Sequence, residues 1–129
     1  MRVVIVRHAE AEPGEPDELR SLTDEGRAHA EAVGRRLRDE GVVADVVLTS
    51  PLLRARETAA ALGLGEPEAH EALRPGATAD GVREAVQGRG ETVVIVGHQP
   101  DCGQIAAALG DGTEPRFPPA GVHMVDLRA

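Results

Sequence analysis

The segment Val3-Val4-Ile5-Val6-Arg7-His8 is a short apolar run that ends in a guanidinium and an imidazole. Its consecutive β-branched residues predict a strand buried on both faces, as in the centre of a parallel sheet. Near the other end of the chain, Val93-Val94-Ile95-Val96-Gly97-His98 repeats the arrangement. The two runs therefore predict two core strands, each followed at its carboxyl end by a histidine.

The other elements follow from hydrophobic periodicity and from the positions of Gly and Pro. Strands are predicted over residues 2–7, 45–49, 92–96 and 122–127, the last at an edge of the sheet. Helices are predicted over residues 23–40 with Thr23 as N-cap, from Ser50-Pro51 to about Leu62, weakly over 79–87, and over about 101–109. Residues 9–22, 64–78 and 110–120 are rich in turn-forming residues and are expected to be loops.

This order of elements predicts an α/β fold with three layers, α/β/α, around a mainly parallel central sheet. A chain of 129 residues suffices for one core, so we expect residues 1–129 to form a single domain. In such sheets, ligands bind beyond the carboxyl ends of the strands. Arg7-His8, the segment from Ser50 to Arg54, and His98 all follow predicted strands, so we expect them to share one crevice.

Two Arg and two His in one crevice suit a phosphoryl group. Arg7 and Arg54 can bind phosphate oxygens bidentately, and the helix start at Ser50-Pro51 adds backbone N–H groups. Of His8 and His98, one neutral imidazole is expected to attack phosphorus, while the other, protonated, donates hydrogen bonds to the phosphoryl oxygens. Arg20 could also reach the phosphate, although nothing in the sequence fixes its direction.

Composition excludes several classes of protein. The net charge is −8 and all 14 basic residues are Arg, which makes nucleic acid or an anionic membrane a poor partner. No apolar run approaches the roughly 18–20 residues that span a bilayer, and a single Cys cannot form an internal disulfide. The remaining His residues lack metal-ligand spacing, so neither a metal nor a cofactor is expected. We expect a cytoplasmic protein.

Four segments resemble the signatures of the histidine phosphatase (phosphoglycerate mutase-like) superfamily, in the order typical of that family. They are Arg7-His8-Ala9-Glu10, Leu22-Thr23-Asp24-Glu25-Gly26, Ser50-Pro51-Leu52-Leu53-Arg54-Ala55 with Thr58, and Val96-Gly97-His98. The resemblance implies a metal-independent phosphatase in which His8 is the nucleophile. It further implies that Arg7 and Arg54 bind phosphate and that His98 stabilises the transferring group.

The chain also departs from the family pattern. Ala9 replaces the usual Gly, and Pro75 stands where larger members carry a general-acid Glu. Glu71 and Asp80 are nearby substitutes, although the spacing favours neither. A missing acid matters less when the leaving group is the nitrogen of a phosphohistidine.

The short chain is similar to the SixA-type phosphohistidine phosphatases, which implies a phosphohistidine-bearing protein as substrate. Two alternatives stay open. One is a phosphatase acting on small sugar or nucleoside phosphates, and the other is a catalytically weak phosphate-binding or interaction module.

Overall fold

The computed structural model describes residues 1–127, so the last two residues of the predicted domain lie outside the described residues. The strands are β1 (Arg2–Arg7), β2 (Val46–Thr49), β3 (Pro67–Ala69), β4 (Thr92–Gly97) and β5 (Val122–Asp126). The helices are α1 (Asp24–Asp39), α2 (Leu53–Leu62), α3 (Ala79–Val86) and α4 (Asp101–Leu109), with 3₁₀ turns η1 (Asp17–Leu19) and η2 (Glu71–Leu73). Within the described residues, no helix has both the length and the apolar character needed to cross a membrane.

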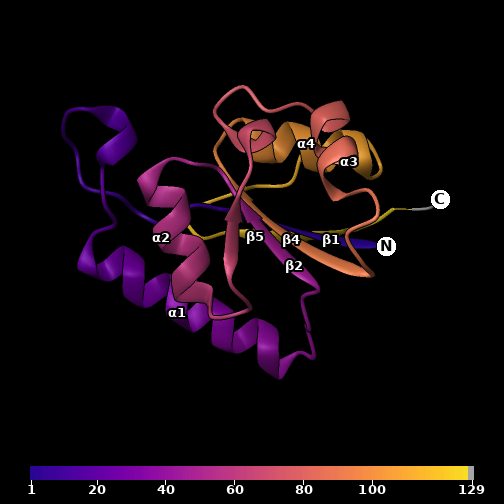
Figure 1. Cartoon of the computed structure of the whole chain (residues 1–129), viewed down its shortest axis with the longest axis horizontal. Coiled ribbons are helices and arrows are strands. Elements are labelled where there is room, and N and C mark those ends of the chain that lie inside the picture. Colours follow the sequence, from indigo (N-terminus) through magenta and orange to yellow (C-terminus); the bar gives the residue numbers. More distant parts are fainter. Residues whose placement is uncertain (128–129) are drawn as a thin grey trace.

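The five strands form one sheet in the order β3-β2-β4-β1-β5 (Figure 1). β1 and β4, the two apolar runs, are parallel neighbours in register, with Val3 opposite Val93 and Val6 opposite Val96. β5 is antiparallel to β1 and forms one edge, as predicted. β2 and β3 continue the parallel sheet on the other side of β4. The sheet is therefore mixed but mostly parallel.

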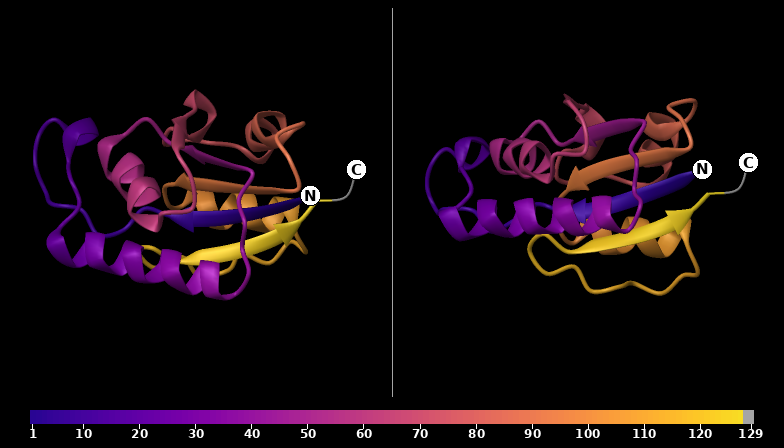
Figure 2. Two further views of the ribbon diagram at one scale, coloured as in Figure 1. Left: turned by 60° about the horizontal axis from the view of Figure 1, so that its bottom comes forward. Right: turned by 90° about the horizontal axis from the view of Figure 1, so that it is seen from below.

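Helices cover both faces of the sheet, which confirms the predicted α/β/α layers (Figure 2). On β1, Val3 and Ile5 pack with side chains of α3 and α4, while Val4 and Val6 pack with those of α1 and α2. Alternate residues of a strand point to opposite faces, so a continuous apolar run fills two cores at once.

Two local predictions were wrong. The second helix begins at Leu53, not at Ser50-Pro51, because its first backbone hydrogen bonds are accepted by the carbonyl of Leu52. The Ser50 hydroxyl instead accepts the Leu52 N–H within a bend.

The region 64–78, expected to be loop, contains β3 and η2. β3 is a three-residue edge strand in which Pro67 is half-buried and the other two residues are exposed, so it carries no hydrophobic pattern.

The carboxyl ends of the parallel strands β1, β2 and β4 meet at one edge of the sheet. From β1 the chain runs out into the segment 8–23 and returns to α1, closed by an antiparallel bridge between Ala11 and Leu22. η1 lies at the tip of this segment, beside α2 (Figure 1). The segment therefore reaches the edge at which the predicted site residues gather.

Candidate active site at the carboxyl ends of the strands

His8 directly follows β1, and its backbone N–H donates to the carbonyl of Gly97, 2.9 Å away. The ring Nδ1 lies 2.7 Å from the carbonyl oxygen of Ala9. A carbonyl only accepts, so Nδ1 carries the proton and the neutral ring keeps its lone pair on Nε2. Burial, together with the positive charges of Arg54 and Arg7, lowers the pKa of His8. His8 is thus a neutral imidazole with a free basic nitrogen at neutral pH.

His98 follows β4, and its ring centroid lies 5.2 Å from that of His8, with the planes tilted by 60°. Its Nε2 is 2.8 Å from the Oγ of Ser50, the residue that follows β2. Burial and the nearby His8 and Arg54 lower the pKa of His98 to about 4. The sequence predicts a protonated second histidine. In this structure His98 is neutral at pH 7, because a buried imidazolium beside Arg54 is disfavoured.

Arg54 lies in the first turn of α2, and only 8% of its side chain is exposed. One terminal nitrogen donates to the backbone carbonyl of Asp17 at 2.9 Å, and the other lies 3.2 Å from the Asp17 carboxylate. Thr58 Oγ1 donates to the Arg54 carbonyl and accepts the Ala9 N–H. This hydroxyl therefore ties the start of α2 to the residue after His8.

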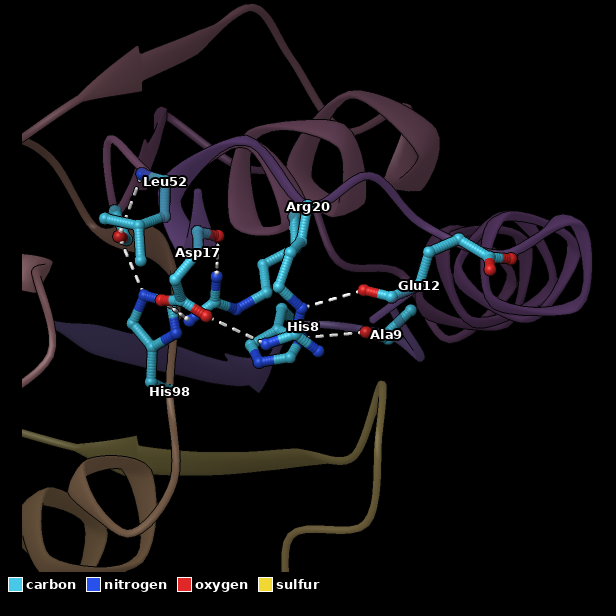
Figure 3. Close-up of polar contacts among 9 residues, drawn as sticks. His8, Ala9, Glu12, Asp17, Arg20, Leu52 and His98 are labelled. Carbon is cyan, nitrogen blue, oxygen red and sulfur yellow. Dashed lines mark hydrogen bonds and ion pairs between the residues drawn. The ribbon is translucent and has the colours of Figure 1, made fainter. Parts of the chain in front are cut away.

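Arg7 ends β1, and its Nη1 donates to the carbonyl of Phe117 at 2.9 Å. Its charge lowers the pKa of His8, as does that of Arg20, so both cations are close to the imidazole. Arg20, whose direction the sequence left open, donates from Nε to the carbonyl of Glu12 and from Nη1 to the Asp17 carboxylate, at 2.7 and 3.0 Å (Figure 3).

Three donor atoms of this cluster stand out from the rest of the molecule. In the part of the chain that the structure describes, the buried side-chain nitrogens without a hydrogen-bond partner are Arg7 Nε, Arg54 Nε and His98 Nδ1. Buried polar atoms are almost always paired in folded proteins, so an orphaned set of this kind calls for an explanation. All three belong to predicted phosphate-binding residues. The set is suited to a small anion.

Asp17 is a site residue that the sequence did not single out. Its carboxylate joins Arg54 to Arg20, and in Figure 3 it lies between the rings of His8 and His98. The hydrogen bond from Arg20 holds the pKa of the Asp17 carboxyl below its usual range, so this group is a carboxylate at neutral pH. An ionised carboxyl of low pKa is a poor proton donor.

The two substitute acids lie on the surface. Glu71, in η2, pairs with Arg74, and Asp80, in the first turn of α3, pairs with Arg83 at 3.5 Å. Neither contact involves the histidine pair, and a role for either carboxylate as an acid stays a prediction. Among residues 1–127, no three His, Cys, Asp or Glu side chains are grouped as metal ligands would be.

Comparisons with known proteins point to one family. Residues 3–75 match the model of the histidine phosphatase superfamily (branch 1). An uncharacterised protein of Picosynechococcus sp. is 37% identical over 101 residues, which cover 72% of this chain and 61% of that protein. The mitochondrial serine/threonine-protein phosphatase Pgam5 of Drosophila mojavensis is 43% identical over 58 residues, covering 44% of this chain and 20% of that protein. This chain thus spans only part of the length of both relatives.

A solved structure gives the most extensive match of these. The protein histidine phosphatase SixA complexed with tungstate superposes with a TM-score of 0.89 at 27% identity. The superposition covers 96% of this chain and 86% of that one.

Proposed function

Because this chain belongs to branch 1 of the histidine phosphatase superfamily, we propose that it hydrolyses protein phosphohistidine through a phosphohistidine intermediate on His8. The observation that carries the proposal is the set of orphaned donors on Arg7, Arg54 and His98 around a histidine whose Nε2 is basic and free. A tetrahedral phosphoryl group accepts hydrogen bonds from all three while its phosphorus faces the nucleophile.

The reaction has two steps. In the first, the Nε2 lone pair of His8 forms a bond to phosphorus as the bond to the leaving group breaks, and the leaving group keeps that electron pair. In the second, water attacks the phosphorus of phospho-His8, the N–P bond breaks back to the imidazole, and inorganic phosphate leaves with the water oxygen. In both transition states, Arg7, Arg54 and His98 stabilise the charge on the oxygens that do not react. As the phosphoryl dianion binds, its negative charge raises the pKa of His98, which strengthens that donor.

The substrate class rests on the leaving group. An alkoxide needs a proton as it departs, whereas the imidazole of a protonated phosphohistidine departs as a neutral ring. Glu71 and Asp80 are paired with surface arginines, and the Asp17 carboxyl is ionised. The lack of a proton donor among these three carboxyl groups disfavours a substrate with a poor alkoxide leaving group. The likeness to a protein histidine phosphatase along almost the whole chain supports the same substrate.

The test compares substrates and trapped intermediates. Phosphate release is measured, with excess chelator present, from a phosphotransfer protein phosphorylated on histidine and from a sugar phosphate. His8→Ala is the variant, and His29→Ala, at an exposed position of α1, is the matched control. We expect turnover of the phosphoprotein, lost in His8→Ala and kept in His29→Ala, with an acid-labile phosphoryl label on His8.

Two other results would redirect the proposal. Faster turnover of the sugar phosphate would make this a small-molecule phosphatase. Binding of phosphate with no His8-dependent turnover of either substrate would make it a binding module.

A further inference from the structure

Arg54 already holds an anion that belongs to the chain itself. The Asp17 carboxylate lies 3.2 Å from one terminal nitrogen of Arg54, and the Asp17 carbonyl lies 2.9 Å from the other. Its second carboxylate oxygen accepts a hydrogen bond from Arg20 at 3.0 Å. Two oxygens on the terminal fork of a guanidinium reproduce the way in which a phosphoryl group binds to arginine.

An incoming phosphoryl group therefore meets Asp17 by either approach to Arg54. If it binds end-on to the two terminal nitrogens, it must displace the carboxylate. If it binds side-on through the buried Nε, it lies next to a full negative charge that also acts on His98. The negative charges of the carboxylate and the phosphoryl group repel strongly when both lie beside Arg54, because water is partly excluded from this buried guanidinium. In both cases the carboxylate opposes the phosphoryl group.

The turn that carries Asp17 can yield without disturbing the core. η1 has no buried residue, and the Asp17 side chain is 53% exposed. The carboxylate and carbonyl of Asp17 are held by Arg54 and Arg20, and Arg20 is in turn anchored on the carbonyl of Glu12 (Figure 3). Movement of the turn breaks polar contacts that a bound phosphoryl group can replace.

We propose that Asp17 is an internal competitor for the phosphoryl group, and that its carboxylate sets how tightly the site holds phosphoryl anions. This inference rests on the proposed function, since it takes Arg54 as the phosphate ligand. The competition weakens binding of small free anions, including the product phosphate. A substrate that makes further contacts outside the phosphoryl group displaces Asp17 more readily. Asp17 would thus favour substrates larger than a free phosphate.

The test is an exchange of one charge in the turn. Asp17→Asn keeps the shape and the backbone carbonyl but removes the negative charge, and Glu18→Gln is the matched control at the neighbouring exposed residue. Dissociation constants for orthovanadate and inorganic phosphate are measured by calorimetry, and KM and kcat are measured for the phosphoprotein. We expect Asp17→Asn to bind both oxyanions about three- to tenfold more tightly, with a lower KM, and Glu18→Gln to stay within about twofold of the wild type.

The contrary result is clear. If Asp17 only holds Arg54 in place, Asp17→Asn binds oxyanions as weakly as the wild type or more weakly, and the competition is overturned. An equal gain in Glu18→Gln would also overturn it, by showing a general effect of charge. Both outcomes are measured by oxyanion binding alone. They therefore remain valid even if His8-dependent turnover, the test of the proposed function, is absent.

Discussion

The Nε2 of His98 lies 2.8 Å from the Oγ of Ser50, and the same hydroxyl accepts the Leu52 N–H at 3.2 Å. With one lone pair occupied, the hydroxyl can donate its proton to Nε2, which leaves the ring proton of a neutral His98 on Nδ1. Nδ1 is the orphaned donor assigned to the phosphoryl group. Ser50 is therefore a positioning residue that selects the tautomer of His98.

Replacing Ser50 by Ala should lower kcat/KM about tenfold, because the ring loses the partner that keeps its proton on Nδ1. The same variant should lower the Nδ1–H population of His98, read from ¹⁵N chemical shifts. Thr49→Val, which removes a neighbouring buried hydroxyl bonded to the Ser50 carbonyl, is the matched control and should leave the tautomer unchanged. An unaltered tautomer in Ser50→Ala would refute the role of the hydroxyl.

The pH dependence of activity should report on His8. Burial and the charges of Arg54, Arg7 and Arg20 lower its pKa, so the acid limb of the kcat/KM profile should have its midpoint below 6.5, the ordinary pKa of histidine. Arg20→Gln removes one of these charges, which raises the pKa of His8 and moves the acid limb to higher pH. Arg27→Gln, at an exposed position of α1, should leave the limb in place. The pH profiles of kcat/KM are measured with an activated aryl phosphate. An acid limb that moves to lower pH in Arg20→Gln would contradict this prediction.

The sequence predicts most of the sheet because burial on both faces leaves a direct mark on it. β1 and β4 must be apolar at every position of residues 3–6 and 93–96, since alternate residues of these runs fill separate cores. β3 is short, mostly exposed and at an edge, so pairing with β2 places no such demand on Pro67–Ala69. Helix starts are harder to locate. Ser50-Pro51 has the composition of a cap, yet the Ser50 hydroxyl contacts His98, and the helix begins at Leu53.

The residues of the site also differ in how well the sequence predicts their positions. His8, Arg7 and His98 are at strand ends, so a sequence that fixes the strands also places them together. Asp17 is one of several acids in a polar segment, and nothing local distinguishes it from Glu15 or Glu18. Its contact with Arg54 joins residues 37 positions apart and depends on how the segment folds back over α2. Such a contact is a property of the tertiary structure.

Close packing of α1 on α2 should make Gly34 intolerant of a side chain. A Cβ built at this position would lie 1.9 Å from the carbonyl oxygen and 2.8 Å from the Cα of Leu62, both backbone atoms. Gly34→Ala should therefore lower the free energy of unfolding by about 2 kcal/mol despite the better helix propensity of Ala. Glu31→Ala, exposed on the same helix, should change it by less than about 0.5 kcal/mol. Urea denaturation measures both, and an unchanged or raised stability in Gly34→Ala would show that the helices can separate freely.

Stability should fall as the pH drops, because His98 is buried as a neutral ring. Its pKa of about 4 lies below the value near 6.5 of an unfolded chain, so only the unfolded state takes up a proton between these values. The contribution is complete above pH 6.5 and is lost as the pH falls toward 4, in total about 3 kcal/mol. His98→Asn cannot titrate, so between pH 7 and about 4.5 it should lose roughly 2 kcal/mol less than the wild type does. The exposed His29→Asn should follow the wild type. Denaturation in buffers free of oxyanions tests this expectation, and parallel pH curves for the wild type and His98→Asn would mean that the pKa of His98 is the same in the folded and the unfolded protein.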